Sequence, residues 1–405
     1  MTRFRLRLPP FDVPLAIAAL GLVVIGLFTV FSATSIPGAH QGLWVRQLWW
    51  AAAAVGAAWL VAAVPYRVYD SLAYPTYGIS LALLVLVLVM GSSAYGAKRW
   101  LDLGPLKFQP SELAKIATVL VLARRFDDPK LKLDKFRHWF PALVIVLVPF
   151  ALVLKEPDLG TSLSFPIILL AMFFWAGMPV GHLLLGLTPV FNVVLFFATG
   201  SLWWFAGLLA VLLGAVRPRL AMVVAALVLN GAVAYAMPHV WNGLADYQKR
   251  RIQTFLDPGN DPYGAGYQII QSRIAIGSGG AVGKGFLKGT QKALAFLPMR
   301  HTDFIYSVVG EEFGLLGTLT VVLLYAWLLM RGLRLALLSR GFASLMAIGL
   351  VTALFYHIMV NMLMTIGWAP VTGLPLPLIS YGGTALIVNG IEIGLLQNVA
   401  LRRKD

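Results

Sequence analysis

The sequence predicts an all-α polytopic membrane protein with about twelve transmembrane helices. Of its 405 residues, 59% are hydrophobic and only 12% are charged, whereas a soluble domain carries about 25% charged residues. Apolar runs of about 17 to 25 residues recur along the chain, and each is long enough to cross ~30 Å of hydrocarbon. A soluble fold is excluded, because too few polar residues remain to cover so many apolar helices.

The helices are expected where these apolar runs lie. In chain order the spans are 13–32, 46–64, 74–90, 110–124, 138–154, 160–177, 182–198, 202–216, 219–237, 302–330, 342–364 and 381–400. The first run is too long for the core of a cleavable signal peptide and lacks a small-residue cleavage site. The chain contains no cysteine, which excludes disulfides and thiolate metal sites.

Lysine and arginine predict the orientation, since they accumulate in short cytoplasmic loops. Basic residues precede the first expected helix and follow the second, fourth, eighth, tenth and last. With twelve helices all of these positions fall on one side, so both termini are expected in the cytoplasm. The net charge of +15 then largely reflects membrane topology, and we expect no binding of nucleic acid.

Two segments carry positive charge on the opposite, extracytoplasmic side. One is 91–109, and the other is the long loop 238–301, which separates an N-terminal bundle (1–237) from a C-terminal bundle (302–405). Long loops are partly exempt from the charge rule, so a simple solvated loop is one interpretation. The loop is also rich in glycine, lysine and arginine, which together suit a phosphate. We therefore favour an anion-binding surface outside the membrane.

Two Asp-Pro pairs in this loop carry candidate carboxylates. Asp257–Pro258 and Asp261–Pro262 frame a turn, because Asp and Pro both favour turn geometry. Either carboxylate could simply cap that turn. Beside a cavity in the membrane, partial loss of solvent would instead raise the proton affinity of a carboxylate and make it a candidate general base.

Residues 274–291 form a second glycine-rich stretch, which resembles a phosphate-binding loop only superficially. The residue order of a nucleotide-binding P-loop is absent and no strand–helix unit surrounds the stretch, so nucleotide hydrolysis is not expected. Its backbone amides, together with Lys284 and Lys288, could still bind a diphosphate.

Charged residues within the expected helices are further candidates, because a charge in the membrane is costly and indicates a function by default. Glu112 and Lys115 lie three residues apart on one helix face, where they form either a structural ion pair or part of a site. Asp158 lies at an extracytoplasmic helix junction and leaves the same choice open. Glu311 and Glu312 lie two to three turns inside a helix and need partners or water there.

His301 lies two residues before Asp303, which raises the question of a metal site. The six histidines show no paired metal-ligand spacing, so a structural zinc site is not expected. A loosely bound Mg²⁺ or Mn²⁺ between Asp261 and a substrate diphosphate is compatible with the sequence. Asp303 could instead line a polar cavity with Glu311 and Glu312.

Near the C-terminus, residues 373–384 place prolines and glycines in a membrane segment. Non-helical backbone is tolerated at membrane depth only where protein or a cavity covers it. We expect a re-entrant or unwound stretch that shapes the cavity, with a purely structural kink as the alternative.

In their order along the chain, these motifs resemble the SEDS family (shape, elongation, division and sporulation), and within it the RodA branch. The family blocks span roughly residues 90–390. They are Gly96–Gly104, Phe108–Ile116, Pro157–Thr161, the double Asp-Pro turn, Phe296–Ile305, Gly310–Gly314 and 373–384. The RodA branch rather than the division branch is favoured by Ile274–Gly280, by Gly289–Gln291 and by Arg300 before His301.

The resemblance implies a peptidoglycan glycosyltransferase that polymerises lipid II outside the bacterial cytoplasmic membrane. It matches the essential aspartate of the family to Asp261. It matches an Arg-Trp pair to Arg99 and Trp100, and two membrane charges to Glu112 and Lys115. The rest of the expected substrate-binding set is Asp158, Lys284, Lys288, His301, Asp303 and Glu312.

The resemblance also implies a partner, a class B penicillin-binding protein that supplies transpeptidation within an elongation complex. Members of the RodA branch usually have ten helices, so the twelve expected here include a surplus pair within about 182–219. An inserted pair leaves the sidedness of all later segments unchanged. Two other functions stay open: a lipid II flippase, and a non-catalytic scaffold for cell-wall enzymes.

Overall fold

The computed structural model has a helix at each of the twelve expected positions. It describes residues 11–35, 42–94, 97–104, 106–131, 133, 135–199, 203–216, 220–243, 249, 266–290 and 299–402. The helices at the expected positions are α1 (Val13–Thr34), α2 (Leu43–Ala63), α3 (Tyr66–Met90), α4 (Pro110–Phe126), α5 (Phe136–Lys155), α6 (Leu159–Trp175), α7 (Val180–Thr199), α8 (Trp203–Val216), α9 (Leu220–Gly243), α13 (Ile305–Leu338), α14 (Gly341–Thr365) and α15 (Gly383–Leu401). A further helix, α11 (Tyr267–Ser278), lies inside the predicted loop. The predicted polytopic helical fold is confirmed.

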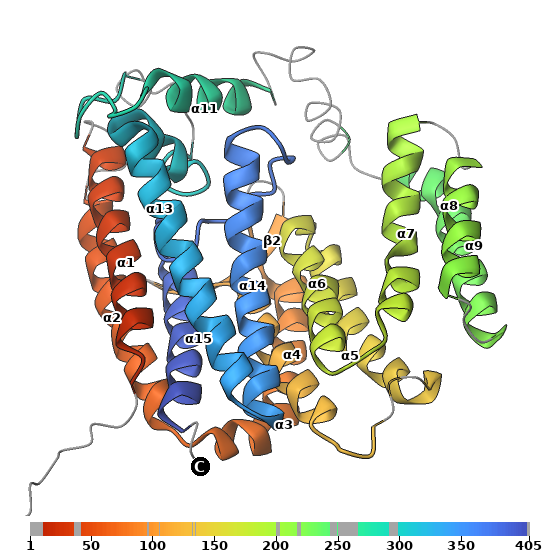
Figure 1. Cartoon of the computed structure of the whole chain (residues 1–405). Coiled ribbons are helices and arrows are strands. Elements are labelled where there is room, and N and C mark those ends of the chain that lie inside the picture. Colours follow the sequence, from red (N-terminus) through yellow and green to blue (C-terminus); the bar gives the residue numbers. More distant parts are fainter. Residues whose placement is uncertain are drawn as a thin grey trace, which may run out of the picture.

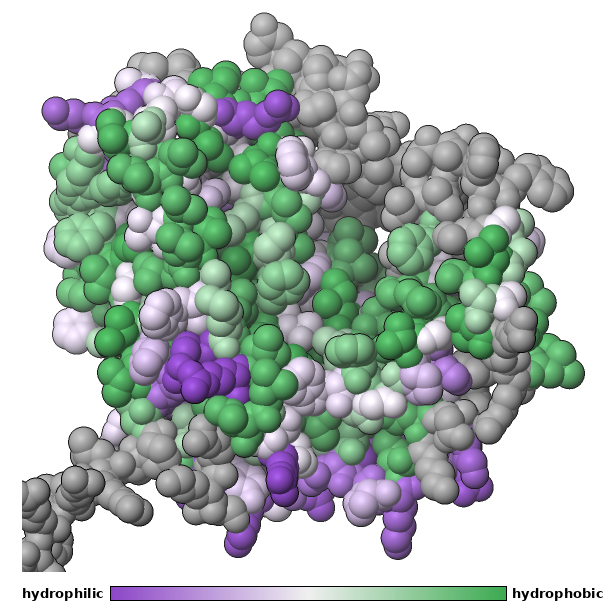
Figure 2. Space-filling view, viewed as in Figure 1, coloured by the Kyte–Doolittle hydropathy of each residue, from purple (hydrophilic) through white to green (hydrophobic). Residues whose placement is uncertain are grey.

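The helices give the molecule the surface of a membrane protein. Among the described residues, seven helices are long and apolar enough to cross a membrane, judged by length and composition. Others are shorter, such as α4 and α6 with 17 residues and α8 with 14. Figure 2 shows an apolar belt with hydrophilic residues gathered towards its two ends. In Figure 1, α11 lies across the end opposite the C-terminus.

Helix α14 lies at the centre of the bundle. It packs against α4, α6 and α13, and most of its side chains are buried. Gly349 allows the close approach, because a Cβ there would lie 2.6 Å from a methyl group of Val119 in α4. α15 packs along α2, with the backbones in contact at Gly390 and Gly394. Small residues at such crossings are the usual means of bringing membrane helices together.

Helices α7, α8 and α9 form a small group of their own at one side of the molecule (Figure 1). Polar side chains connect α7 to α9: Asn230 Nδ2 donates to Thr188 Oγ1 at 2.8 Å, and Asn192 Nδ2 donates to the Asn230 carbonyl at 3.2 Å. The group also has a separate apolar cluster around Leu185 and Leu209. The surplus helical pair expected within about 182–219 falls in this group.

A small antiparallel sheet lies between α3 and α4 and was not expected from the sequence. Its strands β1 (Ser92–Ala94), β2 (Ala97–Leu103) and β3 (Leu106–Phe108) lie in that order, with Leu101 opposite Phe108. The middle strand carries Arg99 and Trp100, and β3 leads directly into α4. The sheet therefore places the Arg-Trp pair next to the start of the helix that carries Glu112 and Lys115.

The segment 366–382 between α14 and α15 is not helical, which confirms the unwound stretch expected around 373–384. Side chains bind its backbone: Asn361 Nδ2 donates to the Leu374 carbonyl at 2.7 Å, and Gln47 Nε2 donates to the Ser380 carbonyl at 3.0 Å. Ser380 Oγ accepts from the Leu376 amide at 2.8 Å. These contacts replace the helical hydrogen bonds that membrane-embedded backbone otherwise requires.

The glycine-rich stretch after α11 packs tightly against α13. Helical dihedrals of α13 are interrupted at Gly314, where φ is +62°. The amides of Lys284 and Gly285 donate to the carbonyls of Glu311 and Glu312, both at 3.0 Å. These two amides are thus bonded to α13, so the structure contradicts the expectation that they are available to a diphosphate.

A substitution at Gly283 tests the packing of the glycine-rich stretch against α13. Its φ is +81°, and a Cβ would lie 2.1 Å from the Glu312 carbonyl oxygen. We expect Gly283→Ala to release the stretch from α13, with backbone strain alone costing on the order of 1–3 kcal/mol. Limited proteolysis and the detergent Tm measure the effect. The control is Gly277→Ala in α11, where a Cβ meets nothing within 4 Å; equal behaviour of the two variants would contradict the docking.

Candidate active site

Arg99 and Asp158 meet at the turn between α5 and α6. Arg99 Nε donates to the Glu156 carbonyl at 3.2 Å, the guanidinium also donates to the Pro157 carbonyl, and Nη1 lies 3.8 Å from Asp158 Oδ1. Asp158 caps α6, accepting from the Thr161 amide at 3.2 Å and the Thr161 hydroxyl at 2.9 Å. The pair fixes the turn, and this contact leaves the predicted substrate role of both residues open.

Two neighbours complete this corner of the site. Gln109, just before α4, donates from Nε2 to Asp158 Oδ2 at 3.1 Å and so ties the start of α4 to the start of α6. Trp100 follows Arg99 on β2 and is half-buried. The sheet, the start of α4 and the start of α6 therefore meet at Asp158.

Glu156 is a buried carboxyl in this corner that sequence reasoning did not single out. It is fully buried, and among the described residues neither carboxyl oxygen has a hydrogen-bond partner. Burial, with a smaller contribution from the negative charge of Asp158, raises the pKa of Glu156 to about 8, although Arg99 acts in the opposite direction. The group therefore keeps its proton at neutral pH, which lets it remain buried without a counter-ion.

A second cluster joins α4, α14 and α15 inside the bundle. Lys115 Nζ lies 3.0 Å from Glu112 Oε2 and 2.7 Å from His357 Nε2. Glu392 of α15 interacts electrostatically with both Lys115 and Glu112. All four side chains are at most 4% exposed. The predicted Glu112–Lys115 pair is confirmed, while His357 and Glu392 were missed.

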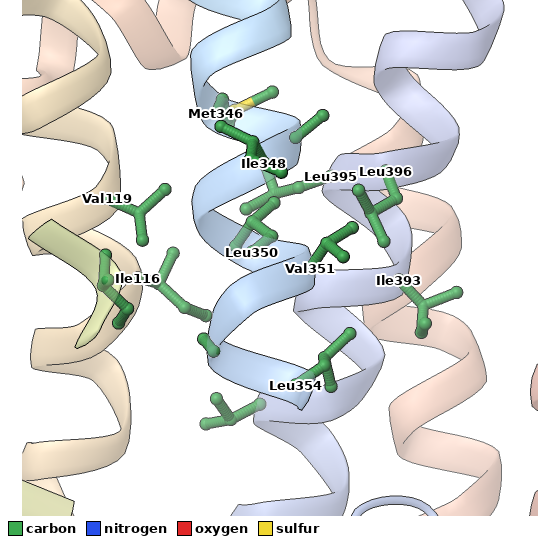
Figure 3. Close-up of a cluster of buried hydrophobic side chains, with 14 of the residues drawn as sticks. Ile116, Val119, Met346, Ile348, Leu350, Val351, Leu354, Ile393, Leu395 and Leu396 are labelled. Atoms are coloured by element: carbon green, nitrogen blue, oxygen red, sulfur yellow. The ribbon is translucent and has the colours of Figure 1, made fainter. Parts of the chain in front are cut away.

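Packed apolar side chains close the bundle on one side of this cluster. α14 runs opposite to α4 and α15, so the residues after Lys115, before His357 and after Glu392 all lie on the same side. Figure 3 shows them in contact: Ile116, Val119, Met346, Ile348, Leu350, Val351, Leu354, Ile393, Leu395 and Leu396. In the other direction along α4, the chain leads from Lys115 back to β3 of the sheet, on the half of the bundle towards α11 (Figure 1).

His301 and Asp303 lie beside the unwound segment 366–382. The Tyr381 amide donates to the His301 carbonyl at 2.9 Å, and the two rings are 5.8 Å apart. Asn361 Nδ2 donates to the Asp303 carbonyl at 2.9 Å as well as to the Leu374 carbonyl. A Cβ on Gly160 at the start of α6 would meet Leu374, so this region adjoins the Asp158 corner.

The predicted residues of the second glycine-rich stretch lie elsewhere. Lys284 Nζ lies 2.8 Å from Glu311 Oε1, which also accepts from the Thr290 amide at 2.6 Å. Glu312 accepts from Ser32 of α1 at 2.6 and 2.8 Å. The Lys284–Glu311 ion pair connects the stretch to α13. Lys288 is exposed. A role of these lysines towards substrate stays a prediction.

The predicted base Asp261 and its neighbour Asp257 lie outside the described residues. Among the described residues, no group of three His, Asp or Glu side chains could hold a metal ion. The sequence-based expectation of a divalent cation at Asp261 is therefore untested by the described geometry.

Comparison with known proteins decides the family. The chain matches the FtsW/RodA/SpoVE cell cycle protein family over residues 10–203 and 185–405, which together cover nearly its whole length. The chain belongs to this family. The expected SEDS membership is confirmed, and the two matched pieces overlap at 185–203, within the α7–α9 group.

Named relatives lie on both branches of the family. The chain is 39% identical to peptidoglycan glycosyltransferase MrdB of Escherichia coli over 395 residues, covering 97% of this chain and 94% of that protein. It is 34% identical to a probable peptidoglycan glycosyltransferase FtsW of Geobacter metallireducens, covering 97% and 96%.

Solved structures agree with the fold. A chain of a peptidoglycan synthase complex that coordinates polymerisation and crosslinking superposes with a TM-score of 0.75 at 32% identity, covering 98% of this chain and 99% of that one. RodA of Thermus thermophilus superposes with a TM-score of 0.65 at 29% identity, covering 98% of each chain.

The buried acid Glu156 gives a prediction on pH. Its pKa is about 8 in the folded protein against 4.5 ordinarily, so between these values the folded state binds a proton that the unfolded chain has lost. The stability contribution of this group therefore falls as the pH rises from about 5 to 8. We expect Glu156→Gln to reduce that fall in Tm, measured in detergent at several pH values. The same slope in both proteins would contradict a protonated Glu156.

Proposed function

We propose that this protein is a peptidoglycan glycosyltransferase that polymerises lipid II into glycan strands during cell elongation. Support comes from the family and from relatives named for this activity. The observation that carries the proposal is the buried cluster around Lys115, with packed apolar side chains next to it in α4, α14 and α15. An anionic headgroup on a long lipid tail fits this arrangement, because the headgroup meets a cation near the membrane edge while the tail stays in hydrocarbon.

In the proposed reaction Asp261 is the general base. It takes the proton of the 4-hydroxyl of the N-acetylglucosamine in the acceptor lipid II, and that oxygen attacks the anomeric carbon of the growing strand. The bond from this carbon to undecaprenyl diphosphate breaks with inversion of configuration. The electron pair leaves with the diphosphate, whose increasing negative charge is best stabilised by donors already in place.

Lys115 and Arg99 are the proposed donors. Lys115 Nζ can direct an N–H at a diphosphate oxygen from inside the bundle. Arg99 keeps 19% of its side chain exposed and has five N–H donors, more than the α5–α6 turn uses. Lys284 and Lys288 are weaker proposals, because Lys284 already pairs with Glu311.

A divalent cation, Mg²⁺ or Mn²⁺, is an additional proposal. It would lie between Asp261 and the substrate diphosphate, and when bound it would neutralise charge on the leaving group. No described cluster of acidic and histidine side chains could hold it without substrate. The proton transfer to Asp261 and the hydrogen bonding by Lys115 do not depend on it.

A lipid II flippase is the alternative from another class. Transport needs a polar path through both halves of the membrane, whereas the side chains of Figure 3 fill the bundle beside the cluster with apolar groups. A scaffold without catalytic activity is the third candidate. It gives no reason to bury Glu112, Lys115, His357 and Glu392 together at a cost in desolvation.

The proposed setting is the bacterial cytoplasmic membrane, with both termini in the cytoplasm and the active site outside. The positive-inside pattern of the loops supports this orientation. The proposed partner is a class B penicillin-binding protein that crosslinks the strands. Similarity to a chain of a synthase complex that joins polymerisation to crosslinking supports that partner.

Asp261→Asn tests the assignment of the base. Loss of a general base typically slows a reaction 10²–10⁴-fold, so we expect at least about a 100-fold lower rate of polymer formation from lipid II. Purified protein in detergent is the right preparation, because without a membrane barrier transport cannot produce polymer. Asp257→Asn is the matched control in the other Asp-Pro pair and should retain activity. Near-normal polymerisation by Asp261→Asn would exclude this base.

A further inference from the structure

The contact between Lys115 and His357 does not follow from the spacing of residues within one helix, unlike the ion pair between Lys115 and Glu112. Glu112 lies one turn before Lys115 on the same helix, so that ion pair follows from local spacing. His357 comes from α14, and its Nε2 lies only 2.7 Å from Lys115 Nζ. It is therefore the contact that fixes the ammonium relative to the rest of the bundle.

The short distance determines how protons are placed. Two protonated groups would repel each other at 2.7 Å, so a single proton lies between Lys115 Nζ and His357 Nε2. With the ammonium charged, His357 is the neutral acceptor and carries its own proton on Nδ1. Glu112 of α4 forms an ion pair with this ammonium, and Glu392 of α15 interacts with it electrostatically.

The ammonium has one donor left. Of its three N–H groups, one points to Glu112 and one to His357. Within the part of the chain that the structure describes, no third acceptor lies within hydrogen-bond distance of Lys115 Nζ, and Glu392 interacts with it only over a longer distance. Because a tetrahedral nitrogen with two fixed donors has its third direction fixed as well, the position of His357 determines where the last N–H points.

We propose that His357 is a positioning residue for the glycosyl transfer: it accepts a hydrogen bond from Lys115 and so directs the remaining N–H of Lys115 at a diphosphate oxygen of the lipid-linked substrate. This inference rests on the proposed function. It assigns a task to a residue of α14 that lies outside the sequence motifs described above. The required property is an acceptor at the position of Nε2, not a titrating group.

Three substitutions separate acceptor geometry from polarity and size. Glutamine places an amide oxygen near the position of Nε2, so His357→Gln should keep most of the activity. Asparagine is one bond shorter, and leucine has no acceptor. A misplacement of about 1 Å can cost 100-fold, so His357→Asn and His357→Leu should lower kcat about 10- to 100-fold. KM should change less, because the contact strengthens as charge develops on the leaving diphosphate.

The experiment measures lipid II polymerisation by the purified full-length protein over a range of lipid II concentrations, with a detergent melt for every variant. Thr352→Val is the control, because Thr352 is also buried in α14, and among the described residues its hydroxyl bonds to the Ile348 carbonyl of its own helix alone. This control should retain its kcat. A loss equal to that of His357→Leu would overturn the inference, since any buried polar change in α14 would then suffice.

The remaining outcomes are separable. Wild-type kcat in folded His357→Leu, or equal loss in His357→Gln and His357→Asn, overturns the positioning role while leaving the proposed function standing. If His357→Leu does not fold, the comparison of His357→Gln with His357→Asn decides. Failure of the wild-type protein to make any polymer overturns the proposed function itself, and the positioning role with it.

Discussion

Burial of charge inside an apolar bundle is the constraint on which the rest of this structure depends. Lys115 is only 2% exposed, and an ammonium at that depth is tolerated only with partners. Glu112 supplies one from the same helix and His357 supplies the other from α14. These contacts require α4, α14 and α15 to keep fixed relative positions. The interlocked apolar side chains of Figure 3 provide that rigidity directly beside the charges.

Backbone polar groups in the non-helical segments need hydrogen-bond partners for the same reason. Where the chain unwinds between α14 and α15, Asn361 and Gln47 bind the carbonyls that a helix would have satisfied. Where α13 breaks at Gly314, the glycine-rich stretch after α11 supplies the missing hydrogen bonds. Non-helical backbone thus stays within the bundle without exposing polar groups to hydrocarbon. Side chains thus hold the non-helical backbone in place at the end of the molecule where we propose that the substrate binds.

Hydropathy located the helices, because a membrane leaves long apolar runs few alternatives. The Glu112–Lys115 pair was predictable from its spacing, but the contact of Lys115 with His357 spans 242 positions, and no local pattern reveals it. The sheet was missed because two of its strands have only three residues. Gly283 shows why glycine is ambiguous: the same residue permits approach to an anion or to the backbone of a helix. The sequence favoured approach to an anion, whereas in the structure Gly283 approaches the backbone of α13.

The most direct test of the central claim is the double variant Glu112→Gln/Lys115→Met, assayed for thermal stability and for polymer formation from lipid II. Removing both members of a buried ion pair is often neutral or stabilising, whereas removing one leaves an unpaired charge. If the pair is there for chemistry, the double variant keeps a Tm near that of the wild type, melts above Lys115→Met alone, and forms no polymer. A folded double variant that polymerises lipid II at the wild-type rate would contradict the account.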